Sequence, residues 1–589
     1  MTPKNLSTKP ASRPLLSETD STPGLREQGT MTIDADKLRE IRERAKKKAE
    51  ASTTATEDTS KYLPDARPPM FVHTITLDTA VAQGVGAMAS ATRSGKHYVY
   101  RQVSSLGEPK ALVTIKPTGQ PRIWPEGDAA ALVYLMVQPV KKGVEVDGEV
   151  YPSEYDTAFP PNVARAIYAQ ALHDPRIPAV RIISTAPVLL PDGRIAREQG
   201  YNADEQVLIT YAESERDAWA QRYVVPDEPT PEEAQAAAEY VMYEVLGDVP
   251  FEGDEDKATS LVYFTTCATR DMYGTAPFFA FDAPERGTGK SLVASCGRII
   301  GQGNSNYQSI GYRKGQDAEI WKSLGTLALK NGRHAHVDEL PRDDRVNSTA
   351  LSEIATTPVA STRLLGANSE IVLEGLMVTV CGNNITLGLD FNRRFFKARL
   401  HFVGSDAAYR RGGFRHKNLA RWVAQHRPEL LAALHTVVRY GLQNGIEPDK
   451  SLGSYEDWSS VVLGSLSVIT INGASVTDLA LSAQATLSRE EDEVADEWGG
   501  MLAAIHQHFD EGQWHEMVEI HKGMRINTPE DVELPEVLLM AGGNFSDQAR
   551  AWSKHFKTMK DTPVEYNGER YAIRWATIRS RPRFRVVKL

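Results

Sequence analysis

The sequence predicts an α/β protein with an open parallel sheet at its centre, an α+β region before it, and a helical segment and a small helix-and-hairpin module after it. Three observations predict this order. Short apolar runs alternate with helical patterns over residues 275–403, as in buried parallel sheets. A glycine-rich turn, "ERGTGKS", follows the first of these runs and opens a helix. Residues 546–589 form a helix pattern, a hairpin signal and a last strand pattern.

Composition sets the bounds. The chain has 589 residues, of which 41% are hydrophobic and 24% charged, so we expect several soluble globular domains. The formal net charge of −10 excludes a uniformly basic chain, and any contact with nucleic acid has to come from a local basic surface. Three scattered cysteines exclude a zinc knuckle and a disulfide framework, which favours a reducing cytoplasm. The sequence contains no long apolar run and no signal sequence, so we expect neither membrane insertion nor secretion.

The first 62 residues are rich in Ser, Thr, Pro, Lys and Glu and have too few apolar side chains to offset the entropy of ordering. We expect them to be disordered, apart from a short charged helix over 34–52, and Met31 offers an alternative translation start. Residues 63–225 mix strand and helix patterns and carry no recognisable chemical motif. Residues 226–274 predict a linker of two helices, the first of which begins at Pro231 with two glutamates in its opening turn.

A phosphate-binding loop is predicted at the start of the parallel sheet. The apolar strand "PFFAFDAP" leads into "ERGTGKS" and then into a helix that we expect to stop at Gly301. Gly287 and Gly289 allow backbone N–H groups on either side of Thr288 to face an anion, Lys290 reaches the β and γ phosphates, and Ser291 can bind magnesium. Pro284 stands where the usual pattern has its first glycine, so a chance occurrence is the alternative.

A second strand should supply the acids that such a loop requires. In "GRHAHVDELP", Asp338 is placed to hold Mg²⁺ through water and Glu339 to orient or deprotonate the attacking water. His334 and His336 lie in the same strand. We expect them to pack or bond locally, because no third metal ligand lies at a useful spacing.

Two further pairs of residues follow. Asn383 and Asn384 end the strand "EGLMVTVCGNN", and the carboxyl edge of a parallel sheet faces the ligand crevice. Either amide could align the attacking water, and a plain turn asparagine is the alternative for one of them. Arg393 and Arg394 precede the next strand, too far along the chain to reach their own nucleotide easily. An arginine at such a place commonly serves the ATP of a neighbouring subunit, whereas a surface salt bridge is the ordinary explanation.

The order "PERGTGKS", "HVDEL", "GNN" and "DFNRR" resembles an AAA+ ATPase of the P-loop NTPase class, and more specifically the superfamily-3-like, poxvirus-type replication helicases of phages, plasmids and integrated elements. The resemblance covers about residues 65–510 and is strongest over 275–400. It implies a ring, a hexamer, with ATP and Mg²⁺ at each interface and single-stranded DNA in the centre. It also implies that residues 361–375 form a hairpin that projects into the channel. Arg363 would be its DNA-contacting base, and the alternative is a hairpin that only packs.

The carboxyl-terminal part divides into a helical lid over residues 404–510 and a module over 511–589. The module's helix aligns Arg550, Lys554 and Lys557 on one face, and Asn567 with Gly568 marks a hairpin turn. Helix, hairpin and strand resemble a winged-helix module. From Arg570 to Leu589 the sequence has seven basic residues and no acidic one, although the chain as a whole is acidic. This asymmetry favours salt-dependent, sequence-neutral binding of DNA phosphates, and a solvated basic face is the alternative.

Together these features predict an ATP-hydrolysing DNA helicase or translocase that acts in replication of a phage or another mobile element. An ATP-controlled assembly or regulatory switch, such as a helicase loader or defence component, is the alternative. A small-molecule kinase is disfavoured by the long lid and the arginine pair. The expected catalytic residues are Lys290, Glu339, Asn383, Asn384, Arg393 and Arg394; Gly287, Thr288, Gly289, Lys290 and Ser291 would bind the nucleotide, and Ser291 and Asp338 the metal.

Overall fold

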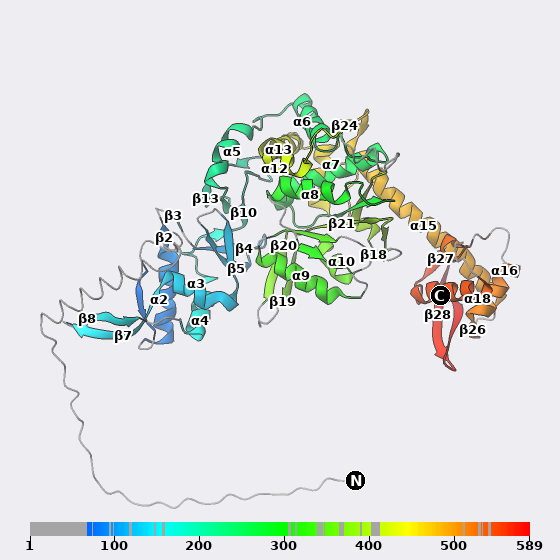
Figure 1. The fold of residues 1–589 in the computed structure, drawn as a ribbon, viewed down its shortest axis with the longest axis horizontal. Coiled ribbons are helices and arrows are strands. Elements are labelled where there is room, and N and C mark those ends of the chain that lie inside the picture. Colours follow the sequence, from blue (N-terminus) through cyan, green and yellow to red (C-terminus); the bar gives the residue numbers. More distant parts are fainter. Residues whose placement is uncertain are drawn as a thin grey trace, which may run out of the picture.

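The structure is a computed structural model of the whole chain (Figure 1). It describes residues 67–589 except 73–74, 94–95, 98, 117–119, 147–148, 156–158, 304–307, 313–314, 331, 338–344, 347, 364–369, 389–390, 402–412, 510–512, 528–531, 533 and 540–543. The first 62 residues, predicted as a disordered tail with one short helix, lie outside the described residues. Among the described residues, no helix combines the length and the apolar character that crossing a membrane requires.

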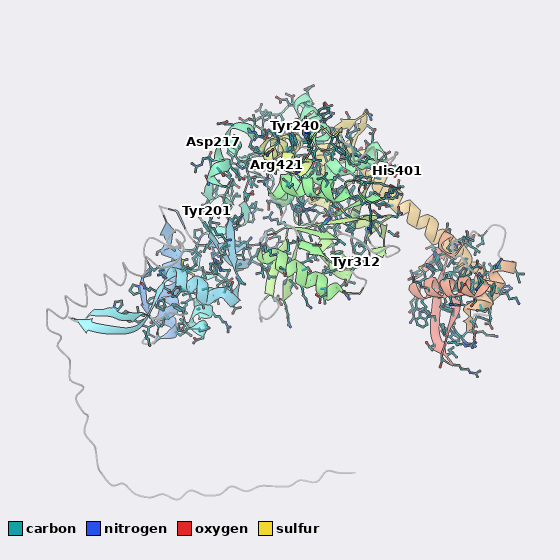
Figure 2. All side chains as sticks on the ribbon, in the orientation of Figure 1. Tyr201, Asp217, Tyr240, Tyr312, His401 and Arg421 are labelled. Carbon is teal, nitrogen blue, oxygen red and sulfur yellow. The ribbon has the colours of Figure 1, made fainter. Side chains whose placement is uncertain are left out.

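The region before residue 226 is α+β, as its mixed patterns predict. One sheet has the order β6-β5-β4-β9, a second β1-β7-β8 and a third β10-β14-β13. The turn around Gly193 joins β11 to β12 as an antiparallel pair. Tyr201, labelled in Figure 2, donates its hydroxyl to the carbonyl of Ala179 and ties two of the sheets together. The elements are β1 Pro69–Phe71, α2 Leu77–Ser90, β2 Thr92–Arg93, β3 Lys96–His97, β4 Val99–Val103, β5 Pro109–Ile115, β6 Pro121–Trp124, α3 Ala129–Met136, β7 Gln138–Val146, β8 Glu149–Tyr155, α4 Pro161–Ala171, β9 Ala179–Val180, β10 Ile182–Ser184, β11 Val188–Leu189, β12 Ile195–Ala196, β13 Gly200–Asn202, β14 Val207–Ile209 and α5 Arg216–Arg222.

The centre of the molecule is a sheet of five parallel strands in the order β16-β17-β21-β15-β23. All six residues of β15 are buried, because helices cover both faces of the sheet. Phe279 and Phe281 pack with the helices on one face, and Phe278 and Ala280 pack on the other. Tyr312, labelled in Figure 2, belongs to the core on the second face. The strands and the helices of this part are β15 Phe278–Ala283, α8 Lys290–Gln302, β16 Gln308–Ile310, α9 Asp317–Leu329, β17 His334–Val337, β18 Arg345–Val346, α10 Thr349–Thr356, β19 Val359–Arg363, β20 Glu370–Glu374, β21 Met377–Asn383, β22 Thr386–Leu387 and β23 Phe395–Arg399.

Helix α8 ends later than predicted. Gly301 lies inside the helix, and Gly303, with φ 78°, is the left-handed residue that terminates it. Gly301 is required for another reason: a Cβ there would lie 2.4 Å from the carbonyl oxygen of Cys267 in the neighbouring helix. Gly301 therefore allows α8 to pack closely against the helix that contains Cys267, and it does not end α8.

The two helices over residues 226–274, expected as a linker, belong to the central core. Helix α6 (Pro231–Glu244) begins with a capping box between Thr230 and Glu233. Helix α7 (Asp254–Ala268) is buried along most of its length and packs beside α8 and α15. The following helices are α12 Leu419–Gln425, α13 Arg427–Gln443, α14 Glu456–Trp458, a π-helical turn Ser459–Gly464 and α15 Val476–His508, with the short strands β24 Thr470–Ile471 and β25 Ala474–Ser475.

Helix α15 runs from the central part into a separate carboxyl-terminal unit (Figure 1). Its last turns, including Trp498 and Ile505, contribute to that unit's own hydrophobic core together with Trp552 and Phe584. An antiparallel sheet in the order β26-β29-β28-β27 completes the unit. The elements are β26 His515–Glu516, α16 Met517–Asn527, α17 Glu536–Leu539, α18 Phe545–Thr558, β27 Val564–Tyr566, β28 Glu569–Ile578 and β29 Arg581–Lys588.

Candidate functional site

The glycine-rich loop connects the carboxyl end of β15 to the first residue of α8. Gly287 and Gly289 have φ of 84° and 99°, a left-handed conformation that favours glycine. A Cβ placed on either of them would meet no atom within 4 Å, so the space in front of the loop is open. Pro284, directly after β15, does not prevent the loop from forming this geometry. The loop therefore leaves room for a ligand in front of the backbone N–H groups at the start of α8, which is the arrangement that anion binding requires.

Lys290 is the first residue of α8 and is buried, with 9% of its surface exposed. Its ammonium donates to the carbonyl oxygen of Glu285 at 2.8 Å and to Oγ1 of Thr288 at 3.3 Å, both within the loop. It also donates to Oδ1 of Asn383 at 2.7 Å, a residue 93 positions further along the chain. The structure thus brings two of the predicted site residues into direct contact.

Asn384 occupies a left-handed turn with φ 51° immediately after β21. Its N–H donates to the carbonyl oxygen of Ala283 at the end of β15. Its Oδ1 lies 3.5 Å from a guanidinium nitrogen of Arg399, at the carboxyl end of β23. The two asparagines therefore have different surroundings: Asn383 contacts the loop lysine, and Asn384 is the turn asparagine.

Arg399 is a site residue that the sequence patterns did not reveal. Its guanidinium contacts Oδ2 of Asp282 at 3.2 Å and Oε2 of Glu252 at 2.9 Å. Asp282 is fully buried in β15, where it also accepts from the N–H of Ile385 at 2.9 Å. A carboxylate inside an otherwise apolar strand requires a partner. Asp282 within the apolar run of β15 is therefore the sequence feature that indicates a partner such as Arg399. Its partner depends on the parallel register that places Asp282 beside Arg399.

Asp256, in the first turn of α7, holds the backbone of the same arginine. It accepts from the N–H of Arg399 at 2.6 Å and from the N–H of Gly253 at 3.0 Å. Burial raises the pKa of Asp256 to about 6, against the opposing effect of these two hydrogen bonds.

Asp338 and Glu339, the expected magnesium-site acid and catalytic base, lie outside the described residues. Their strand, β17, ends at Val337 and lies beside β21 in parallel. The carboxyl end of β17 therefore lies at the same edge of the sheet as the loop and Asn383. Ser291, the other expected metal ligand, is exposed at the start of α8.

The two strand histidines make local contacts. His336 Nδ1 lies 2.7 Å from Oγ1 of Thr379, and His334 Nε2 lies 3.4 Å from Sγ of Cys267. Burial, followed by the charge of Arg298, lowers the pKa of His334 well below its usual value. No cluster of three potential metal-ligating side chains occurs within the described ranges. These contacts agree with the expectation of local packing.

Arg393 and Arg394 lie in a short 3-10 turn directly before β23. Since β23 is parallel to β15, its first residue lies at the amino edge of the sheet and the loop lies at the carboxyl edge. A five-residue strand spans about 16 Å, which separates both arginines from the loop of their own chain. Arg393 is exposed and Arg394 is half-buried.

The predicted hairpin over 361–375 is present as β19 and β20, and residues 364–369 at its tip lie outside the described residues. Arg363 is exposed and stands opposite Glu370 across the two strands. At the base of the hairpin, Glu374 accepts from the N–H of Ser105 at 2.8 Å and from Nζ of Lys110 at 3.3 Å. The hairpin therefore packs against the amino-terminal region as well as against α9.

The predicted basic face of the carboxyl-terminal helix is α18. Arg550 is 76% exposed and pairs with Asp547 of the same helix. Lys554 and Lys557 are exposed. The ammonium of Lys557 lies 5.4 Å from the ring centre of Trp575 in β28.

Comparisons with known proteins give no family assignment. No family model matches the chain, and no curated protein matches it. One similar solved structure is described as the A form apo structure of the NrS-1 C-terminal region, residues 305–718, with a TM-score of 0.29 and 11% identity over 66% of this chain and 78% of that chain. A TM-score of this size does not establish a shared fold. The chain is a mixed α/β protein with a parallel sheet and many helices.

Proposed function

We propose that the chain binds and hydrolyses ATP at the carboxyl edge of its parallel sheet, as an AAA+-like P-loop ATPase. One observation carries this proposal: the ammonium of Lys290 bonds both to its own loop and to Asn383 of the neighbouring strand. A cationic side chain, a left-handed glycine loop and a helix amino terminus converge there, which suits the β and γ phosphates of a nucleotide. A chance "GTGKS" sequence would have no reason to be paired with a polar strand end.

Within this site each residue has a proposed task. The loop N–H groups and Lys290 bind the phosphates, and Asn383 releases the ammonium to the β and γ phosphates and aligns the attacking water. Glu339 takes the proton from that water. Ser291 and Asp338 would hold Mg²⁺, which would neutralise charge on the phosphate oxygens. The oxygen donors of a hydroxyl and a carboxylate fit this ion.

The arginine pair supports action between subunits. Arg393 and Arg394 lie at the opposite edge of the sheet from their own loop, so the site that either could serve belongs to a neighbouring copy of the chain. We therefore propose a ring, a hexamer, in which the site is completed by an arginine from the next subunit.

Nucleotide hydrolysis is tested with two variants. Lys290→Ala should abolish hydrolysis and weaken ATP binding, because the cation that contacts the phosphates is lost. Glu339→Gln should abolish hydrolysis and retain ATP binding. Full phosphate release by either variant would contradict the site.

The proposed work of the ATPase is DNA unwinding or translocation in replication of a phage or other mobile element. A strand-displacement assay on a forked duplex with ATP and Mg²⁺, run beside an ATPase assay with and without DNA, tests this. ATP hydrolysis that ignores DNA, with no displacement, would favour the second candidate, an ATP-controlled assembly switch. The contact of Glu374 with Ser105 and Lys110 is the observation that favours this alternative, because it links the β19–β20 hairpin to the amino-terminal region.

A further inference from the structure

The hairpin of β28 and β29 carries a row of arginines on one face. Cross-strand register places Arg574 opposite Arg585, Ala576 opposite Arg583, and Ile578 opposite Arg581. Side chains alternate between faces along a strand, so these four arginines share a face. The other face carries the core residues Tyr571, Ile573, Phe584 and Val586 and the partly buried Trp575.

The charge on this arginine face is only partly compensated. Asp561 pairs with Arg574, and Glu516 pairs with Arg581 and Arg583. Directly opposite like charges destabilise a strand pair, yet Arg574 and Arg585 stand opposite each other. The arginine face and the tip, where Arg579 lies, together have five arginines. Among the described residues, two carboxylates form ion pairs with three of these arginines, Arg574, Arg581 and Arg583, which leaves an excess of three positive charges on a chain whose formal net charge is −10.

The turn at the tip of this hairpin is conformationally unfavourable. Arg579 and Ser580 have φ of 52° and 63°, and neither is a residue type that favours the left-handed region. The neighbouring hairpin between β27 and β28 has the same kind of turn and builds it from Asn567 and Gly568, with φ of 52° and 78°. The same small sheet therefore contains two left-handed turns. The turn at Asn567 and Gly568 has residue types that favour this geometry, whereas the turn at Arg579 and Ser580 has an arginine in a strained conformation. Strain of this kind is typical of functional sites.

The burial of the hairpin decreases toward that tip. Ile573 and Phe584 are fully buried, whereas Thr577, Arg579, Ser580 and Arg581 are exposed. The side chain of Arg581 is 71% exposed. Figure 1 shows the far end of the two strands extending beyond the helices of the unit. The tip is thus accessible to a large partner.

We propose that the arginine face and tip of the β28–β29 hairpin bind the phosphate backbone of duplex DNA, and that they, rather than α18, are the main DNA contact of the carboxyl-terminal unit. The choice of DNA as the partner rests on the proposed function. The evidence for a phosphate-binding surface comes from the hairpin itself. Guanidinium groups suit phosphate oxygens, and a row of them along a projecting hairpin can follow a backbone without reading sequence.

The aromatic residues near the hairpin favour duplex over single-stranded DNA. Single-strand binding relies on exposed rings on which bases stack. Residues 577–582 at the tip contain no aromatic side chain. Of the rings nearby, Trp514 is covered by the guanidinium of Arg585 at 4.7 Å, and Trp575 lies beneath the ammonium groups of Lys557 and Lys560.

The test replaces the strained turn with the favourable one. In the full chain, Arg579→Asn with Ser580→Gly gives the hairpin the same turn residues as its neighbour, so the variant should fold, and amide hydrogen exchange of residues 571–588 should slow. Its affinity for a short fluorescent duplex of arbitrary sequence, without nucleotide, should fall about tenfold. The slope of log Kd against log salt should decrease by about one, as expected when one phosphate contact is lost. Arg581→Gln should act in the same direction.

The matched control neutralises the helix instead, with Arg550→Gln and Lys554→Gln in α18. The proposal expects duplex affinity to change less than twofold in this control. It is overturned if the helix variant loses more affinity than the turn variant, if the turn variant binds as the unmodified chain does, or if single-stranded DNA or duplex RNA binds more tightly than duplex DNA. ATP hydrolysis without DNA should be unchanged in all these variants. If the unmodified chain did not hydrolyse ATP, the proposed ATPase activity would be contradicted. The DNA-binding assay would still test the arginine hairpin, because it is carried out without nucleotide.

Discussion

Replacing Asn383 with alanine should separate nucleotide binding from hydrolysis. Oδ1 of Asn383 accepts a hydrogen bond of 2.7 Å from the ammonium of Lys290. A hydrogen bond to a charged group contributes about 1.5–3 kcal/mol. A phosphate that binds the ammonium of Lys290 has to displace Asn383 and break this hydrogen bond. In Asn383→Ala the hydrogen bond is absent, so nucleotide binding costs less free energy.

The magnitude follows from the burial of the lysine. Lys290 is 9% exposed, so solvent screens the bond only weakly, although a water molecule can replace part of it in the variant. We therefore take about half of the range, roughly 1 kcal/mol, which corresponds to an affinity for ADP that is about fivefold tighter. ATP hydrolysis should fall about 100-fold, the usual loss when one polar group that stabilises the transition state is removed.

The assay is a titration of Asn383→Ala with ADP, beside steady-state phosphate release from ATP. Asn384→Gly is the matched control, because it removes the neighbouring amide, keeps the left-handed turn at φ 51° and leaves the contact to Lys290 in place; its ADP affinity should stay within twofold. If Asn383→Ala bound ADP more weakly than the unmodified chain, the amide would be a nucleotide ligand and not a competitor for the ammonium, and the reasoning would be refuted.

Three other predictions concern the core, an acid and the subunit interface. Gly297→Ala would place a Cβ 2.3 Å from the buried ring of Tyr263, so it should lower the free energy of unfolding by about 1–3 kcal/mol; Tyr263→Leu in the same chain should recover part of the loss in a denaturant titration. The pKa of Asp256 is raised to about 6 by burial, so the unmodified chain should lose stability relative to Asp256→Asn as pH rises from about 4 to 6, by about 1–3 kcal/mol, and keep that difference above pH 6. A pH-independent difference would show that the carboxyl is not titrating there. Arg394→Ala should eliminate ATP hydrolysis, and mixing it with Lys290→Ala chains should restore some activity; no restoration at any ratio would contradict action between subunits.

The local parts of the site could be predicted from the sequence. An apolar strand, a glycine turn and a helix are determined by neighbouring residues, and the structure contains them as β15, the loop with Gly287 and Gly289, and α8. The antiparallel turn at Asn567 and Gly568 is present for the same reason.

The features that depend on tertiary contacts could not be predicted. Gly301 resembles a helix stop, but its function is to admit a neighbouring helix that no local pattern reveals. The turn at Arg579 and Ser580 carries no residue type that favours the left-handed conformation found there, so the pairing of β28 with β29 determines it. The partnership of Asp282 with Arg399 joins residues 117 positions apart and exists only in one register of two parallel strands.

Asp282 explains how the two halves of the site are held together. The loop is joined covalently to the end of β15, whereas the asparagines belong to β21. Two bonds attach the asparagine turn to β15: the N–H of Asn384 donates to the carbonyl oxygen of Ala283, and the N–H of Ile385 donates to Oδ1 of Asp282. A fully buried carboxylate is costly unless a cation compensates it, and Arg399 supplies that cation from the strand on the other side. The polar residue in an apolar strand therefore has a positional role, because it fixes the asparagine turn relative to the loop whose lysine Asn383 contacts.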